Sequence, residues 1–298
     1  MDEFNEIIKK IGEELHIKVT LLSDNWLTIL ENDKEIHYIQ GYKFGLNDHG
    51  IGNIIDDKGL FFDLLTYKGL PTVYQKVLFK DYDKKNVLAF FHDYHDDIIV
   101  KGNIGTCGKE VYHVTDEKTL FTTIDYLFQS QFSLSLSPYY DIENEYRVIL
   151  LDKEPRIIYG KKRPIVIGDG KRSLQELAME FNSYYQENIV KNHSYIPKNG
   201  EEVILNYQFN LSNGARMFLD ISSDLKEKLI KIAKMVVEKL DITFASVDII
   251  ETRDKELLIL EANSGVMMNN YIKQKENGYQ DAYNLYRDAI KLMFKMNK

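Results

Sequence analysis

The sequence predicts a protein of the mixed α/β or α+β class, in which helices cover β-sheets. Three observations support this class. Predicted strands and helices alternate along the whole chain, the helices are amphipathic, and strongly apolar strands form a hairpin near the C-terminus. With 298 residues, 44% of them hydrophobic and 28% charged, the chain is long enough for two or three domains with a sizeable core.

The composition argues against several classes of function. Acidic residues outnumber basic ones by 46 to 38, which is unlike a nucleic-acid-binding protein. Cys107 is the only cysteine, so the chain forms no internal disulfide and no zinc–cysteine cluster. No apolar run approaches the roughly 20 residues of a membrane span, and the acidic N-terminus is unlike a signal peptide. We therefore expect a cytoplasmic protein that binds neither nucleic acid nor a membrane.

The first third of the chain predicts helices and strands in alternation. Apolar residues recur every three or four positions from Phe4 to Leu15, so we expect a helix over 2–15. The next predicted elements are strands over 18–22, 26–31 and 72–79 and helices over 59–66 and 86–94. Lys58 stands where the second helix begins, and Asp57 before it would be favourable near a helix N-terminus.

Two stretches each allow a functional and a structural interpretation. His92 and His95 stand beside acidic residues and would suit either a metal site or a solvated helix end. Gly102, Gly105 and Gly108 follow a short buried strand, and glycines there would let backbone N–H groups approach a phosphate closely. Their spacing is neither that of a Walker A loop nor that of GxGxxG, so a plain hairpin loop is the alternative.

The middle of the chain continues the alternation. The predicted elements are a strand over 110–114, a helix capped by Thr115 and reaching Gln129, an extended segment over 133–140, strands over 146–151, 156–159 and 203–209, a helix from a Ser173–Glu176 capping box to Tyr185, and helices over 224–240, capped by Ser223, and 280–296. Arg163 ends a run of three bases and Arg216 stands in a predicted turn. Each would bind an anion or simply decorate the surface.

The C-terminal hairpin combines two apolar strands, 245–252 and 257–263, with acidic residues inside them. Pairing Thr252 with Leu257 across the charged turn sets Asp248 directly opposite Glu261. Directly opposed side chains lie about 5 Å apart, so two carboxylates there would repel each other.

A bound cation would relieve this repulsion. Asn263 shares the face of Glu261, because side chains two positions apart on a strand point to the same side. Two carboxylates and an amide oxygen are hard ligands that suit Mg²⁺ held together with substrate phosphates. The alternative is an exposed hairpin with scattered acids, but Asp248 and Glu261 both interrupt apolar strands, where an unpaired acid is costly.

From about Tyr42 to the C-terminus, the order of these parts resembles the ATP-grasp family. The motifs that carry the resemblance are Asp57-Lys58 with Gly69-Leu70-Pro71, Ile99-Val100-Lys101 with its glycine loop, Glu145-Tyr146-Arg147-Val148, Ile167-Gly168-Asp169-Gly170, Asn210-Leu211-Ser212, and Asp248 with Glu261-x-Asn263. The segments at Ile167 and Asn210 look most like the cyanophycin synthetase and glutathione synthetase branches.

The resemblance implies an ATP-grasp fold, with two α+β lobes that clamp ATP and a small N-terminal subdomain. The expected boundaries are 1–57 for the N-terminal subdomain, 58–137 for the small lobe and 138–298 for the large lobe. The expected ATP contacts are Lys58 and Lys101 at the phosphates, Gly105 and Gly108 in a closing loop, Ser137, Tyr139 and Tyr140 at adenine, and Glu145 at ribose. Asp248, Glu261 and Asn263 match the family's Mg²⁺ ligands, with Mn²⁺ as an alternative metal.

The sequence departs from the family in two places. The adenine segment carries Ser135-Leu136-Ser137-Pro138 where the family usually has an acidic residue. The stretch after Asn263 is Ser264-Gly265-Val266-Met267 and lacks the usual Pro-Gly. The second departure concerns the pocket for the acceptor substrate rather than the metal.

The function that the resemblance implies is ATP-dependent ligation of a carboxylate to an amine or thiol, with small-molecule or peptide substrates. Arg147, Arg163 and Arg216 are candidates to steady the carboxylate and an acyl phosphate. Two alternatives stay open on the same scaffold: a non-catalytic ATP sensor and a small-molecule kinase. Many relatives are dimers, so a homodimer is a further expectation from the resemblance.

Overall fold

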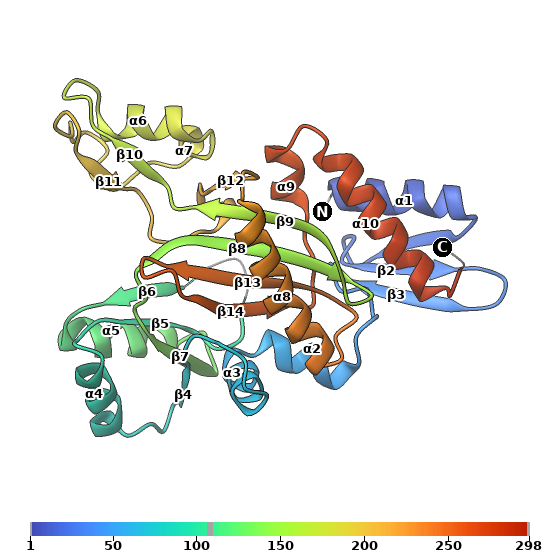
Figure 1. The fold of residues 1–298 in the computed structure, drawn as a ribbon, viewed down its shortest axis with the longest axis horizontal. Helices are drawn as coiled ribbons and strands as arrows, with labels where there is room; N and C mark the ends of the chain where they lie inside the picture. The colour runs from blue at the N-terminus through green and yellow to red at the C-terminus, as the bar shows by residue number, and fades with distance from the viewer. Residues whose placement is uncertain (1, 106–109, 297–298) are drawn as a thin grey trace.

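The computed structural model describes residues 2–105 and 110–296, which form four β-sheets with helices packed on them (Figure 1). The mixed fold class predicted from the sequence is therefore confirmed. None of the helices within the described ranges has the length and apolar character that crossing a membrane requires.

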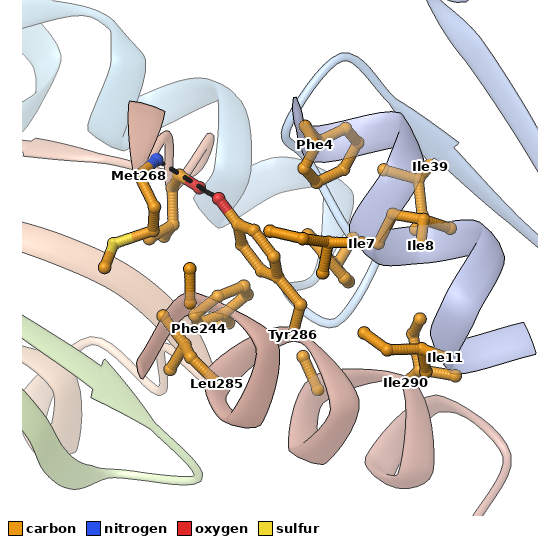
Figure 2. Close-up of a cluster of buried hydrophobic side chains, with 14 of the residues drawn as sticks. Phe4, Ile7, Ile8, Ile11, Ile39, Phe244, Met268, Leu285, Tyr286 and Ile290 are labelled. Atoms are coloured by element: carbon orange, nitrogen blue, oxygen red, sulfur yellow. Dashed lines mark hydrogen bonds between the residues drawn. The ribbon is translucent and has the colours of Figure 1, made fainter. Parts of the chain in front are cut away.

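The N-terminal layer joins the two ends of the chain. Its elements are α1 (Asp2–Leu15), β1 (Lys18–Leu22), β2 (Leu27–Glu31) and β3 (Ile36–Gln40), together with α9 (Asn269–Gln274) and α10 (Gly278–Met293). The helix that follows β3, α2 (His49–Asp56), packs instead on the core of the large sheet through Ile55. The three strands form an antiparallel sheet, and α10 lies beside α1 (Figure 1). The apolar stripe of α1 supplies Ile7 and Ile11, which pack in one core with Ile290 of α10 and Phe244 (Figure 2).

Tyr286 of α10 ties this core to the segment that follows Asn263. Figure 2 shows its hydroxyl beside the backbone of Met268, surrounded by apolar side chains. The hydroxyl accepts a hydrogen bond from the Met268 N–H at 3.1 Å and donates one to the Val266 carbonyl at 2.9 Å. Tyr286 is 1% exposed, so water cannot reach this position. Without the hydroxyl, the Met268 N–H and the Val266 carbonyl would have no hydrogen-bond partner there.

The second layer is a four-stranded sheet in the order β4-β7-β5-β6. Its elements are α3 (Lys58–Tyr67), β4 (Lys76–Phe79), α4 (Lys84–Asp93), β5 (Ile98–Gly102), β6 (Val111–Val114), α5 (Glu117–Leu127) and β7 (Ser133–Pro138). One face packs against α4 and α5 through Val100, Leu136, Phe91 and Ile124. Side chains alternate along a strand, so Lys101 points to the opposite face.

The third layer is a five-stranded sheet in the order β12-β9-β8-β13-β14. Its strands are β8 (Ile142–Leu151), β9 (Glu154–Lys162), β12 (Arg216–Phe218), β13 (Phe244–Thr252) and β14 (Leu257–Asn263), and α8 (Ser223–Lys239) crosses one face (Figure 1). Val148, Val247 and Ile249 pack there against Leu229 and Val236 of α8. The opposite face carries the charged residues described below.

A small fourth unit projects from the end of the large sheet (Figure 1). It consists of β10 (Ile165–Ile167), α6 (Leu174–Phe181), α7 (Tyr184–Glu187) and β11 (Glu202–Ile204), followed by the 3-10 turn η1 (Leu211–Asn213). Val166, Leu177 and Tyr185 form a separate small core there. The predicted Ser173–Glu176 capping box is confirmed.

Several local predictions were wrong. Asp116 rather than Thr115 caps α5, because its carboxylate accepts the Thr119 N–H. Ser222 rather than Ser223 caps α8. The predicted strand over 203–209 ends at residue 204, and the helix predicted to reach Tyr185 is broken into α6 and α7.

Five α-helices and strands were not predicted, namely β3, α2, β10, β12 and α9, and the turn predicted at Arg216 is wrong because Arg216 begins β12. The apolar side chains of β3 point to both faces, so its residues show no polar–apolar alternation. Two glycines inside α2 disfavour a helix, which forms nevertheless with Asp48 as its N-cap. β10 has only three residues and α9 only six, too short for a periodic pattern.

The double hydrogen bond of Tyr286 gives a stability test. We expect Tyr286→Phe to lower the free energy of unfolding by about 2 kcal/mol, because it leaves a buried carbonyl and a buried N–H unpaired. Tyr283→Phe, on the same helix, removes a hydroxyl that binds the exposed Glu14 carboxylate and should cost roughly 0.5 kcal/mol. Urea unfolding measures both variants. Equal losses would contradict the role assigned to Tyr286.

Candidate active site

The hairpin of β13 and β14 sets Asp248 directly opposite Glu261, as the sequence predicts. The predicted pairing of Thr252 with Leu257 is wrong, because Leu257 pairs with Glu251 and the connecting loop is one residue longer. A bulge directly after Asp248 shifts the pairing back by one position. The longer loop and the bulge therefore cancel at the acidic pair.

Four charged residues from three neighbouring strands meet on the face of the sheet opposite α8. Asp248 of β13 pairs with Arg147 of β8, and Glu145 of β8 pairs with Lys161 of β9. The register brings them to one side because residues two apart on a strand share a face. We call Glu145, Arg147, Lys161 and Asp248 the charge cluster.

Hydrogen bonds fix the geometry of the charge cluster. Arg147 binds Asp248 with two nitrogens, Nε to Oδ1 at 2.7 Å and Nη2 to Oδ2 at 2.5 Å. Lys161 Nζ lies 3.2 Å from Asp248 Oδ1 and also donates to Glu145 Oε1. Asp248 is 1% exposed, Lys161 4% and Glu145 8%, so water contributes little to their solvation.

The protonation states follow from this pairing. Burial alone would raise the pKa of Asp248, but Arg147 and Lys161 outweigh it and lower this pKa to about 2. Burial raises the pKa of Glu145, although the ammonium of Lys161 opposes the rise. Burial and the nearby Arg147 would lower the pKa of Lys161, but Asp248 and Glu145 raise it above its usual value. Asp248 therefore carries its charge throughout the neutral range.

Lys101 and Lys58 lie next to the charge cluster, on the other side from α8. Burial and the neighbouring charge of Lys58 lower the pKa of Lys101 to about 8, while Glu261 and Glu145 act in the opposite direction. Within residues 2–105 and 110–296, the Lys101 ammonium forms no ion pair. A buried cation with no counter-ion favours an anionic ligand.

The start of α3 is joined to the glycine loop. Lys58 Nζ donates to the carbonyl oxygens of Gly105 at 3.0 Å and Asn103 at 3.4 Å. The Asn103 side chain accepts a hydrogen bond from the Gly59 N–H and donates one to the Asp57 carboxylate. It therefore fixes the residues on both sides of Lys58. Asn103 was not singled out from the sequence.

The predicted metal ligands provide suitable oxygen donors. Asn263 donates its amide nitrogen to Glu261 Oε1 at 3.3 Å, and both side chains are half-buried at the end of β14. Two carboxylates and an amide oxygen fit Mg²⁺. Both oxygens of Asp248, however, are held by Arg147 and Lys161.

No group of three acidic, histidine or cysteine side chains in the described part of the chain could hold a metal ion. Of the two interpretations of His92 and His95, the metal site is therefore not supported, and His92 binds Asp96 at 2.6 Å. A metal at Glu261 and Asn263 would thus depend on further ligands, such as phosphate oxygens.

The predicted adenine segment lies at the end of β7. Ser137 is 5% exposed and pairs with Ile99. The Tyr139 ring stacks on His113 with centroids 4.2 Å apart, and the Tyr140 hydroxyl accepts the Tyr74 N–H at 3.1 Å. These contacts give the segment a fixed backbone.

Two predicted arginines lie apart from the charge cluster. The Arg163 guanidinium lies over the rings of Tyr207 and Phe209, 5.8 and 4.9 Å from their centroids. Arg216 is exposed, stacks on Phe181, and is on the opposite side of β12 from Met217, which pairs with Lys161. Gly108 and Cys107 lie outside the described residues.

Lys161 is the main site residue that the sequence analysis did not identify. It stands in the run of three bases from which only Arg163 was selected. The sequence predicted β9 to end at Tyr159, whereas the strand continues to Lys162. Strand alternation extended by two residues would have placed Lys161 on the face of Tyr159.

By sequence, no protein-family model and no curated protein matches the chain. By structure, it is similar to a bifunctional glutathione synthetase from Pasteurella multocida, with a TM-score of 0.58 and 16% identity over 99% of this chain. The chain spans 44% of the length of that protein.

It is also similar to a D-alanine–D-alanine ligase from Bacillus anthracis, with a TM-score of 0.56 and 15% identity over 83% of this chain and 72% of that one. That ligase is also solved in complex with ATP. The VanG D-Ala:D-Ser ligase from Enterococcus faecalis has a TM-score of 0.53 and 11% identity over 80% of this chain and 62% of its own. At these identities the similarity shows a shared fold.

The buried ammonium of Lys101 gives a prediction about stability and pH. Its pKa of about 8 lies below the ordinary 10.5, so the charged form is disfavoured in the folded state. We expect Lys101→Met to raise the free energy of unfolding at pH 7 by up to about 3 kcal/mol. The unfolded lysine loses its proton near pH 10.5, so the gain should shrink as the pH rises from 8 toward 10.5.

Urea unfolding at pH 7 and pH 10 measures this gain. Lys118→Met is the control, since it removes an exposed lysine of α5 and should change stability by less than about 0.5 kcal/mol at either pH. A gain that is absent, or that is the same at both pH values, would show that Lys101 carries no buried charge.

Proposed function

From the ATP-grasp fold of this chain, we propose that it is an ATP-dependent ligase that activates a carboxylate as an acyl phosphate and joins it to an amine or thiol. The observation that carries the proposal is the arrangement of Lys58 and Lys101 beside the charge cluster and Glu261. Lys58 and Lys101 would bind the phosphates of ATP. Beside them, the cations of the charge cluster would suit a substrate carboxylate, and its acids together with Glu261 would suit a metal ion.

The proposed reaction has two steps. A carboxylate oxygen of the first substrate attacks the γ-phosphorus of ATP, and the bond from that phosphorus to the bridging oxygen breaks. ADP leaves with the electron pair and an acyl phosphate remains. The nitrogen of the second substrate then attacks the acyl carbon, the carbon–oxygen bond to phosphate breaks, and the nitrogen loses a proton. A thiol would react in the same way through sulfur.

Residues of this chain have a proposed role in each step. Lys58 and Lys101 hold the phosphates of ATP, since the Lys58 ammonium binds a carbonyl oxygen of the glycine loop and Lys101 lies close to Lys58. Arg147 and Lys161 are the cations available to the substrate carboxylate and to the transferred phosphoryl group. Charge-assisted hydrogen bonds of this kind stabilise the charge that develops on oxygen during transfer.

Glu261 and Asn263, with Asp248, are the proposed ligands for Mg²⁺ or Mn²⁺. When bound, the metal neutralises phosphate charge. Glu145 would meet the ribose, a role that requires it to keep one oxygen free beside Lys161. Arg163 and Arg216 stay candidates for substrates that reach beyond the charge cluster.

The remaining assignments are proposals of the same kind. The boundaries 57/58 and 137/138 would separate the N-terminal subdomain and the two lobes. Gly105, with Gly108, would close over the phosphates, and the backbone from Ser137 to Tyr140 would contact adenine. The substrates would be small molecules or peptides.

The experiment that tests the proposal measures ADP and phosphate release with Mg²⁺ and ATP across the common amino acids and short peptides, singly and in pairs. We expect phosphate release only when one carboxylate and one amine are both present. A stable phosphorylated product would instead indicate a kinase. Nucleotide binding without turnover on any pair would indicate a sensor.

Glu261→Gln should lower this turnover by at least about 100-fold while the fold stays intact, because it removes a charged metal ligand. Glu256→Gln is the matched control, an exposed acid in the turn of the same hairpin, and should retain turnover. Circular dichroism checks the fold of both. Full activity of Glu261→Gln would refute the metal assignment.

A further inference from the structure

Asp248 is a proposed metal ligand whose two oxygens are already occupied. Arg147 contacts both of them, and Lys161 adds a third contact to Oδ1 at 3.2 Å. β13 is hydrogen bonded to β8 on one side and β14 on the other, so the Asp248 backbone cannot withdraw. These contacts use three of the roughly four lone-pair positions of the Asp248 carboxylate, so a metal ion that binds there is repelled at close range by Arg147 or Lys161 unless one of them moves.

The charges of the cluster balance without a metal. Glu145 and Asp248 contribute two negative charges, and Arg147 and Lys161 contribute two positive ones. A divalent cation that enters alone therefore meets two fixed cations in a buried setting, where Coulomb repulsion is only weakly screened. Glu261 adds one negative charge, but the neighbouring Lys58 and Lys101 add two positive ones, so no net negative charge is left to attract the ion.

Nucleotide phosphates change this balance. Several negative oxygens beside Lys101 would attract Arg147 and Lys161, and a cation that moves toward phosphate leaves an oxygen of Asp248 available. Arg147 is better placed to move, since its side chain is 20% exposed whereas that of Lys161 is 5% exposed. Its long side chain can reorient without a change in β8.

We propose that Arg147 and Lys161 mask Asp248, so that this site binds a divalent cation only together with nucleotide phosphates. The inference rests on the proposed ATP site and adds a regulation to it. The metal enters as the nucleotide complex, and Arg147 passes from Asp248 to phosphate in the same event. Arg147 is thus a positioning residue in the free protein and a phosphate ligand in the complex.

Mn²⁺ is the probe for this proposal, and the enhancement of water-proton relaxation by protein-bound Mn²⁺ is the readout. Wild-type protein with Mn²⁺ alone should give little enhancement, and addition of ADP should produce a large one. Equal enhancement with and without ADP would overturn the proposal. This comparison needs no variant, so it stands even if a substitution disturbs folding.

Arg147→Met should bind Mn²⁺ without nucleotide at least about tenfold more tightly than wild type, because one masking cation is gone. Lys162→Met is the matched control. It removes the same charge one residue from Lys161, at an exposed position on the opposite face, where Lys162 lies over Phe218. If both variants gained the same affinity for Mn²⁺, the loss of one positive charge would explain the result. Masking of Asp248 by Arg147 would then be contradicted.

Thermal unfolding provides a second readout. Arg147→Met leaves Asp248 poorly compensated and should melt at a lower temperature than wild type. Mn²⁺ without nucleotide should then raise the melting temperature of Arg147→Met and leave wild type unchanged. A variant that is not stabilised by Mn²⁺ would count against the proposal.

These measurements separate the inference from the proposed function. Mn²⁺ binding to Arg147→Met needs neither nucleotide nor turnover, so it can succeed even if no pair of substrates releases phosphate. Conversely, carboxylate-dependent turnover in a wild type that binds Mn²⁺ equally well without nucleotide would support the ligase and refute the masking.

Discussion

Asp248 carries its negative charge on a strand that is paired on both sides, at a position 1% exposed to water. A buried charge in such a place costs several kcal/mol unless a partner of opposite sign is well placed. Arg147 and Lys161 provide that partner, and Lys161 in turn is matched by Glu145. The requirement to neutralise one carboxylate thus places three further side chains of β8 and β9 around it in the free protein, and these are the side chains that the proposed chemistry uses.

The two faces of the large sheet differ: α8 covers one, and the other carries the charge cluster together with Ile149, Tyr159 and Phe244, which pack in the core shared with α1 and α10. The face toward α8 is apolar and buried, and the backbone ladders hold its strands at fixed spacing. The N-terminal helix α1 and the C-terminal helix α10 share another core, and Tyr286 from that core binds the backbone after Asn263. The proposed metal ligands at the end of β14 therefore rest on residues from both ends of the chain. Among the described residues, Lys101 has no such stabilising partner. Its burial disfavours the charged form until an anion binds beside it.

Sequence reasoning worked where one strong pattern decides the outcome. The period of α1 gave its bounds. Asp248 does lie opposite Glu261, but the pairing of Thr252 with Leu257 from which this was predicted is wrong, and the bulge after Asp248 restores the register. Sequence reasoning did not work where long-range contacts decide. β9 continues to Lys162 because β8 and β12 pair with it on either side, and nothing near Lys161 in the sequence indicates this. The engagement of Asp248 by Arg147 depends on a register between strands about 100 residues apart, which no local pattern specifies.

In the proposed reaction, a carboxylate attacks ATP beside the charge cluster and forms an acyl phosphate. The most direct test labels both carboxyl oxygens of the accepted substrate with ¹⁸O and examines the released phosphate by mass spectrometry. We expect one ¹⁸O atom in each phosphate, because the carboxylate oxygen that attacks phosphorus leaves with it. Phosphate without label, formed at the same rate as product, would contradict the acyl phosphate and with it the proposed mechanism.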